Sequence, residues 1–231
     1  MRIFTLVLIV LLAGLAAGPA FAATRFYLPS SGAAEVSPAF SAWTLTTGAD
    51  RLKCVTTRTN TLMINKSTTT TSESVTSLLN RQYVSEPIGA QTITGTVKGQ
   101  LRGMEDNAAQ DMVSCILIKV VSNDGSTVRG TLLNFTYPAL SGNEYGTKIA
   151  NRYTPISASL TTVTAEAGDR IVIEIGAYRY KVGGSTGSCT QTYGDDSATD
   201  LPEDQTTKTA YNPWVEFSQT LGLPKVIIFI D

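Results

Sequence analysis

The 231-residue chain contains no histidine. Histidine is the usual base that activates a serine or cysteine nucleophile, and its imidazole is the commonest zinc and copper ligand. The sequence therefore excludes the Ser-His-Asp and Cys-His classes of hydrolase and every histidine-based metal site. Acid–base chemistry would fall to carboxylates, lysine or tyrosine.

Cysteine is scarce, with only Cys54, Cys115 and Cys189, and no Cys-x-x-Cys pair supports a redox motif or a zinc knuckle. Cys115 lies in the apolar run Val113–Val121, where a free thiol packs as a small hydrophobic group. Cys54 and Cys189 are then the candidate disulfide in an oxidising compartment. The alternative is three unpaired thiols.

Charge is also sparse, because Asp, Glu, Lys and Arg make up 16% of the chain and form no basic stripe. Neither nucleic acid nor an anionic membrane is therefore an expected partner. The glycine-rich stretch Gly183–Ser188 lacks the Gly-Lys-Ser/Thr ending of a phosphate-binding loop. We expect no cofactor and no metal.

The first 22 residues have the pattern of a signal peptide. Arg2 precedes an almost wholly apolar run, Ile3–Leu15, and Ala20-Phe21-Ala22 supplies a small-x-small cleavage site. The run is shorter than the roughly 18–20 residues that span a membrane, so no membrane association is expected after cleavage. We predict a secreted, extracellular or periplasmic protein that begins at Ala23, with net charge −2 after loss of Arg2 from a chain of −1.

Strand patterns dominate the remaining sequence. Apolar and polar residues alternate over Ile93–Leu101, which predicts a strand with one buried face. The segment Met112–Val121 is rich in β-branched residues with few polar breaks, which predicts a strand covered on both faces. Asn123-Asp124-Gly125 separates that run from Val128–Phe135, which is a strong hairpin signal. About nine or ten such segments predict an all-β fold: a single antiparallel β-sandwich, jelly-roll-like, over residues 23–231. One helix is predicted, over residues 73–81.

Two acidic features invite a functional interpretation. Glu174 could serve a carboxylate-dependent glycosidase, although the alternation around it favours a solvated, outward-facing residue. Five acids concentrate between Asp195 and Asp204 without the spacing of a calcium-binding loop, which favours a solvated acidic loop.

Aromatic residues gather in the last third of the chain. Rings that stack on sugar faces are typical of carbohydrate-binding modules, whereas core packing is their commoner use. The candidate ligand-facing residues are Tyr178, Tyr180, Tyr193, Tyr211 and Trp214.

The segment 224–231 is predicted to be an apolar C-terminal strand. It contains Val226–Ile230, flanked by Lys225 and Asp231. Leaving five large apolar side chains in water would forgo on the order of 7–15 kcal/mol, so we expect the run to pair with a sheet edge. That edge belongs either to the same subunit or to a neighbouring one in a homo-oligomer.

Several phrases resemble a family of uncharacterised β-sandwich proteins found in tailed-phage and metagenomic sequences. The resemblance covers almost all of the chain after residue 22 and implies a virion-associated structural or surface-adhesive role, with virion subunits as partners and no catalytic residues. The phrases are Ala23–Pro29, Val36–Pro38, Arg81–Ser85, Gln91–Gly99, Val120–Thr127, Ala167–Gly176 and Asn212–Gln219.

The leading functional hypothesis is therefore a non-enzymatic protein, exported or virion-associated, that acts by assembly or surface attachment. The main alternative is a secreted carbohydrate-binding module whose partner is a glycan. A glycoside hydrolase is the enzymatic alternative.

Overall fold

Fifteen β-strands build the protein in the computed structural model, which describes residues 23–46, 48–62, 64–70, 76–147, 151–153, 157–180, 187–195 and 212–222. The predicted signal peptide, 1–22, and the predicted final strand, 224–231, lie outside the described residues. The strands are β1 (Thr24–Tyr27), β2 (Asp50–Lys53), β3 (Ile64–Thr70), β4 (Thr76–Val84), β5 (Gln91–Ile93), β6 (Thr96–Glu105), β7 (Met112–Val121), β8 (Val128–Thr136), β9 (Gly146–Thr147), β10 (Asn151–Tyr153), β11 (Ser157–Ser159), β12 (Val163–Ala165), β13 (Arg170–Arg179), β14 (Gly187–Tyr193) and β15 (Trp214–Phe217).

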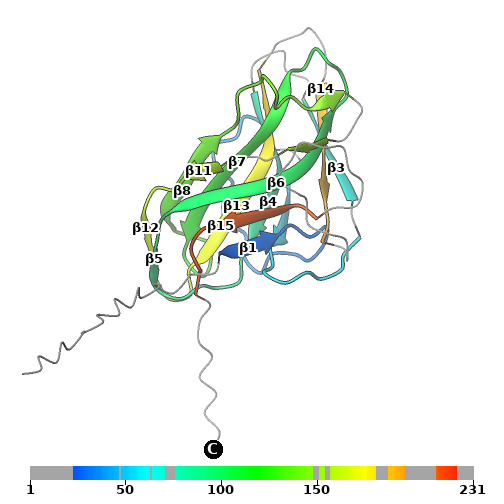
Figure 1. The fold of residues 1–231 in the computed structure, drawn as a ribbon. Helices are drawn as coiled ribbons and strands as arrows, with labels where there is room; N and C mark the ends of the chain where they lie inside the picture. The colour runs from blue at the N-terminus through cyan, green and yellow to red at the C-terminus, as the bar shows by residue number, and fades with distance from the viewer. Residues whose placement is uncertain are drawn as a thin grey trace, which may run out of the picture.

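The strands form two layers (Figure 1). The first sheet has the order β1-β15-β6-β14-β3, with β9, β10 and β11 also paired to β6, and the second has the order β2-β4-β13-β7-β8. β12 and β5 form a separate two-stranded sheet, whose residues Ile93 and Val163 belong to the main core. All pairings are antiparallel except β2 with β4 and β6 with β9. The predicted all-β, jelly-roll-like antiparallel sandwich is confirmed.

Alternating side chains from both sheets meet in the main core. Ile171, Ile173 and Ile175 of β13 point inward and belong to one buried cluster with Leu101 of β6 and Phe217 of β15. Burying large apolar side chains is worth about 1.5–3 kcal/mol each, so this interface between the sheets is the main source of stability.

The central strands agree with the sequence patterns. All ten residues of β7 are buried, as expected for a strand covered on both faces. The β7–β8 hairpin is confirmed, and Gly125 adopts the positive φ of 76° that its turn requires. Gly95, with φ 91°, separates β5 from β6 inside the segment 93–101, which the alternation predicted as one strand.

The helix predicted over 73–81 is wrong for its described part, because residues 76–84 form strand β4. Leu78 and Leu79 are each fully buried, but in different clusters on opposite faces of the sheet. The helical pattern depended on two adjacent apolar residues, and here both are buried because the two faces of a strand paired with β13 are both covered. No helix in the described part of the chain is long and apolar enough to cross a membrane.

The predicted Cys54–Cys189 disulfide is absent, and all three cysteines are free and buried. Cys54 belongs to the main core, whereas Cys189 belongs to a second cluster with Leu78 and Met112. Each thiol packs as a small hydrophobic group, which is the alternative that the sequence left open.

Candidate functional site

A buried carboxylate fastens the segment before β2 to the outer face of the second sheet. Glu174, at the middle of β13, is 0% exposed. Its oxygens accept hydrogen bonds from Ser41 N (3.1 Å) and Trp43 Nε1 (2.6 Å) of that segment. They also accept hydrogen bonds from Gln82 Nε2 of β4 (2.9 Å) and pair with Lys119 Nζ of β7 (3.1 Å).

The prediction that Glu174 is a solvated, outward-facing residue is wrong. The side chain does leave the sandwich on the outer face, as the alternation indicates, but the segment around Ser41 and Trp43 covers it. Four protein donors satisfy both oxygens, as a buried carboxylate requires. The arrangement is that of a structural ion pair, with the carboxylate closed off from a substrate.

Beside this ion pair lies an aromatic cluster, defined here as Trp43, Phe135, Tyr137, Tyr178 and Tyr180. Tyr137 stacks on Tyr178 with ring centroids 3.8 Å apart and an interplanar angle of 5°. Tyr180 meets both rings edge-on, at 5.7 Å from Tyr137 and 5.0 Å from Tyr178. Phe135 packs edge-on against Trp43 at 4.6 Å. The rings come from the covering segment, from the end of β8 and from the end of β13.

The three tyrosines of the cluster are half-buried, so part of each side chain stays accessible. Tyr180 is held by the hydrogen bond that its hydroxyl donates to Pro138 O at 2.9 Å. A hydrogen bond with the Tyr178 side chain, together with burial, raises the pKa of Tyr137 to about 12. Burial also raises the pKa of Tyr180. The hydroxyls of Tyr137 and Tyr180 therefore stay neutral at physiological pH and can both donate and accept hydrogen bonds.

The structure separates the other predicted ligand-facing residues from this cluster. Tyr193 is 0% exposed and Trp214 is 1% exposed. Tyr193 points into the core and donates its hydroxyl proton to Gln191 Oε1 at 3.0 Å, while the guanidinium of Arg25 lies 3.9 Å above the Trp214 ring. The prediction that these two rings face a ligand is wrong. Tyr211 lies outside the described residues.

The beginning of the predicted acidic loop is also closed. Asp195 is 0% exposed and accepts hydrogen bonds from the backbone and hydroxyl groups of Thr59 and Thr61. Its carboxylate therefore holds residues 59–61 in place. Residues 196–211, which contain the rest of the predicted acidic loop, lie outside the described residues. Across the described ranges no cluster of His, Cys, Asp or Glu side chains could hold a metal ion.

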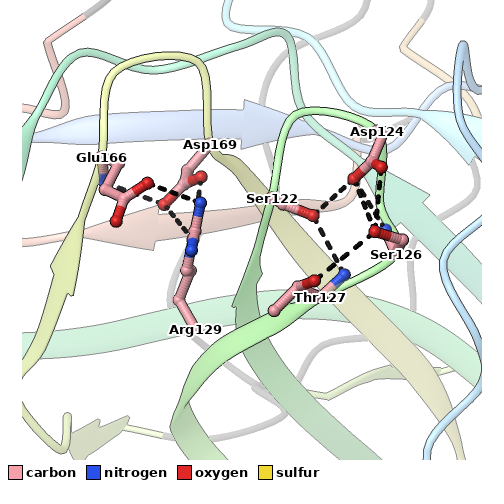
Figure 2. Close-up of polar contacts among 7 residues, drawn as sticks. All are labelled: Ser122, Asp124, Ser126, Thr127, Arg129, Glu166 and Asp169. Atoms are coloured by element: carbon pink, nitrogen blue, oxygen red, sulfur yellow. Dashed lines mark hydrogen bonds and ion pairs between the residues drawn. The ribbon is translucent and has the colours of Figure 1, made fainter.

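Polar contacts lock the turns at one end of the sandwich (Figure 2). Arg129 of β8 donates to Glu166 Oε2 at 2.6 Å and pairs with Asp169 at 3.2 Å, joining β8 to the β12–β13 turn. In the adjacent β7–β8 turn, Asp124 accepts hydrogen bonds from Ser122 Oγ and from the backbone of Ser126. These side chains are engaged with one another and hold the two turns in place.

Sequence reasoning missed three of the five cluster members: Trp43, Phe135 and Tyr137. The sequence contains one signal for the cluster. Phe135 and Tyr137 are two aromatic residues separated by one position, and Tyr178 and Tyr180 have the same spacing. In a strand such pairs point to the same face. Nothing local to Trp43 indicates that its segment crosses β13.

No protein-family model and no curated protein matches the chain. Among solved structures, the chain is similar to a CocE/NonD family hydrolase from Staphylococcus aureus, with a TM-score of 0.48 and 8% identity over 86% of this chain and 36% of that chain. An α-amino acid ester hydrolase gives a TM-score of 0.48 and 9% identity, over 85% of this chain and 36% of that one. The VP2 subviral particle of infectious bursal disease virus gives a TM-score of 0.29 and 12% identity, over 67% and 39%. The chain thus spans little more than a third of each of these proteins, and likenesses of this size do not bear on function.

Proposed function

We propose that this protein is a non-enzymatic binding protein that attaches to surface carbohydrate through its aromatic cluster. The observation that carries the proposal is the half-buried tyrosine group, in which Tyr137, Tyr178 and Tyr180 are fixed against one another within 3.8–5.7 Å. Aromatic rings offer a large apolar face with little conformational entropy to lose on binding, and tyrosine adds a polar handle.

Two observations favour a binding role over catalysis. The chain has no histidine, and the carboxylate considered for glycoside hydrolysis, Glu174, is enclosed by protein donors. A retaining or inverting glycosidase needs two carboxyl groups that both reach the substrate. The proposed setting is outside the cytoplasm or on a virion surface, after removal of residues 1–22.

A glycan array probed with residues 23–231 tests the proposal. We expect reproducible binding to a limited set of sugars, and a loss of about two- to ten-fold in affinity for Tyr137→Ala or Tyr178→Ala, since a stacking contact is worth roughly 0.5–1.5 kcal/mol. Tyr137→Phe and Tyr178→Phe keep the rings and serve as matched controls that should bind nearly as well. Thermal melts of each variant confirm folding.

A folded protein that binds no sugar would overturn the carbohydrate proposal. The structural hypothesis, in which the chain acts only by assembly with copies of itself or with virion subunits, would then replace it. Light scattering on the same sample measures that assembly.

A further inference from the structure

The buried polar site around Glu174 brings together a primary amine and a carboxamide. Lys119 Nζ of β7 and Gln82 Nε2 of β4 come from opposite sides of β13 and contact the same two oxygen atoms. Glu174 Oε1 lies 3.1 Å from Nζ and 2.9 Å from Nε2, and Ala39 O lies 2.7 Å and 3.5 Å from them. Two atoms that share both acceptors lie close together, although their strands do not pair with each other.

The carboxamide of Gln82 is held in one orientation. Its Oε1 accepts a hydrogen bond from Arg51 Nε at 3.1 Å, while its Nε2 donates to Glu174. The reverse orientation would place a carbonyl oxygen against a carboxylate, which only accepts hydrogen bonds. The guanidinium of Arg51 is itself held 3.8 Å above the Phe40 ring. A fixed cation beside a carbonyl oxygen stabilises the negative charge that develops there when a nucleophile attacks the carbon.

Water is kept away from the three side chains. Glu174 and Gln82 are 0% exposed and Lys119 is 5% exposed, because the segment before β2 covers them. In a site closed to water, proton transfer that leaves an ion pair neutral costs less than it does in solution. Groups already held side by side also avoid the entropy cost of meeting, which can account for several kcal/mol of a reaction barrier. The enclosure that excludes a substrate therefore favours a reaction within the chain.

We propose that Lys119 and Gln82 form an intramolecular amide bond, with Glu174 as the acid–base group. Glu174 accepts a proton from Nζ, and the neutral amine attacks Cδ of Gln82 while Arg51 stabilises the charge on Oε1. Glu174 carries two protons in turn from Nζ to Nε2. The Nζ–Cδ bond forms, the Cδ–Nε2 bond breaks and an ammonium ion leaves, so the reaction needs no oxidant and no second reactant. The contacts in the structure are those of the groups before the reaction.

The bond would join β4 to β7 across β13, which are the three central strands of the second sheet. These strands could then not separate by the loss of hydrogen bonds alone. No disulfide makes such a link here, because all three cysteines are free. The reaction occurs once in each chain and is independent of carbohydrate binding.

Intact-mass measurement on the full chain tests the proposal. We expect the folded protein to be lighter than its sequence by one ammonia molecule, allowing for any removal of residues 1–22. A proteolytic digest should contain one branched peptide that joins Lys119 to Gln82. Lys119→Arg keeps a cation beside Glu174 but lacks the nucleophilic amine, and Gln82→Met lacks the carboxamide. Each variant should show the full mass of its own sequence, and thermal melts establish that each is folded.

Gln219→Ala supplies the matched control, because Gln219 bonds to the backbone of Thr92 and Thr94 away from this site. This variant should keep both the mass loss and the branched peptide. A folded wild-type protein that retains its full sequence mass after prolonged incubation would overturn the proposal. A loss of ammonia that maps to other residues, or that persists in Lys119→Arg, would overturn it as well.

Discussion

Trp43 Nε1 lies 2.6 Å from Glu174 Oε2, although the two residues are 131 positions apart in the chain. The contact joins the segment before β2 to the middle strand of the second sheet. It also places the indole ring beside Phe135, so that the aromatic cluster has a rigid backing. The proposed binding face thus depends on a buried ion pair that never meets the ligand.

Replacing that carboxylate should strongly destabilise the protein. Glu174→Ala removes the ionic partner of Lys119 and the acceptor of the Trp43 indole N–H in a buried site. We expect the free energy of unfolding to fall by about 3–5 kcal/mol, the usual cost of breaking a buried pair. Urea denaturation measures it. A matched change at a half-buried acid, Glu144→Ala, should cost much less, and equal effects of the two substitutions would contradict this account.

Stability should depend on pH through a second buried carboxyl, Glu105. Burial, only partly offset by the hydrogen bond from Met112 N, raises the pKa of Glu105 from 4.5 to about 7. The folded state therefore binds the proton more tightly than the unfolded state. The stabilising contribution is full below pH 4.5 and is lost as the pH rises towards about 7.

Glu105→Gln is the matched test of this dependence, because it keeps the shape of the side chain without the titration. Between pH 4.5 and 7 the wild-type protein should lose on the order of 1–2 kcal/mol relative to this variant, allowing for partial screening. Parallel denaturation curves at pH 4.5, 6 and 8 provide the comparison. Indistinguishable pH profiles for the two proteins would show that Glu105 does not titrate in this range.

The fold was predictable from the sequence where the signals are local. Alternation in β6, the unbroken apolar run of β7 and the Asp-Gly turn after it each act within a few residues. The helix prediction failed for β4 because its adjacent leucines are buried on opposite faces by different partners. That information lies in tertiary contacts, which periodicity along one segment does not contain.

The candidate site was only partly predictable. Tyr178 and Tyr180 are candidates because aromatic residues gather in the last third of the chain, but Tyr137, whose ring contacts both, follows directly after β8. The alternation in β13 correctly predicts that Glu174 points to the outer face of the sheet. Its exposure is predicted wrongly, because the segment around Ser41 and Trp43 covers that face. Long-range coverage of this kind has no signature in the strand itself.

The cysteines should behave as three buried thiols. Burial raises the pKa values of Cys54 and Cys115 well above their ordinary range, so little reactive thiolate forms at neutral pH. We expect slow labelling of native protein by a maleimide, and labelling of all three cysteines after unfolding without reductant. A single labelled cysteine in the unfolded sample would instead restore the Cys54–Cys189 disulfide.

Gly176 is the position where the smallest substitution should have a large effect. It sits at the β-bulge of β13, where a Cβ atom would lie 1.8 Å from Leu78 O and 2.7 Å from Cζ3 of Trp43. Alanine cannot fit there unless β4 and β13 separate locally and the indole moves. Overpacking of this kind costs typically about 1–3 kcal/mol in the free energy of unfolding.

Gly176→Ala should therefore lower stability and also weaken carbohydrate binding, because the displaced indole no longer packs against Phe135 in the hydrophobic cluster to which Tyr137 and Tyr178 also belong. Gly222→Ala is the matched control, since a Cβ there would meet nothing within 4 Å. Denaturation curves and glycan affinity are measured on both variants. Loss of stability with unchanged affinity would show that the tyrosines hold their geometry without Trp43, and equal stability of the two variants would show that the strands accommodate the methyl group without cost.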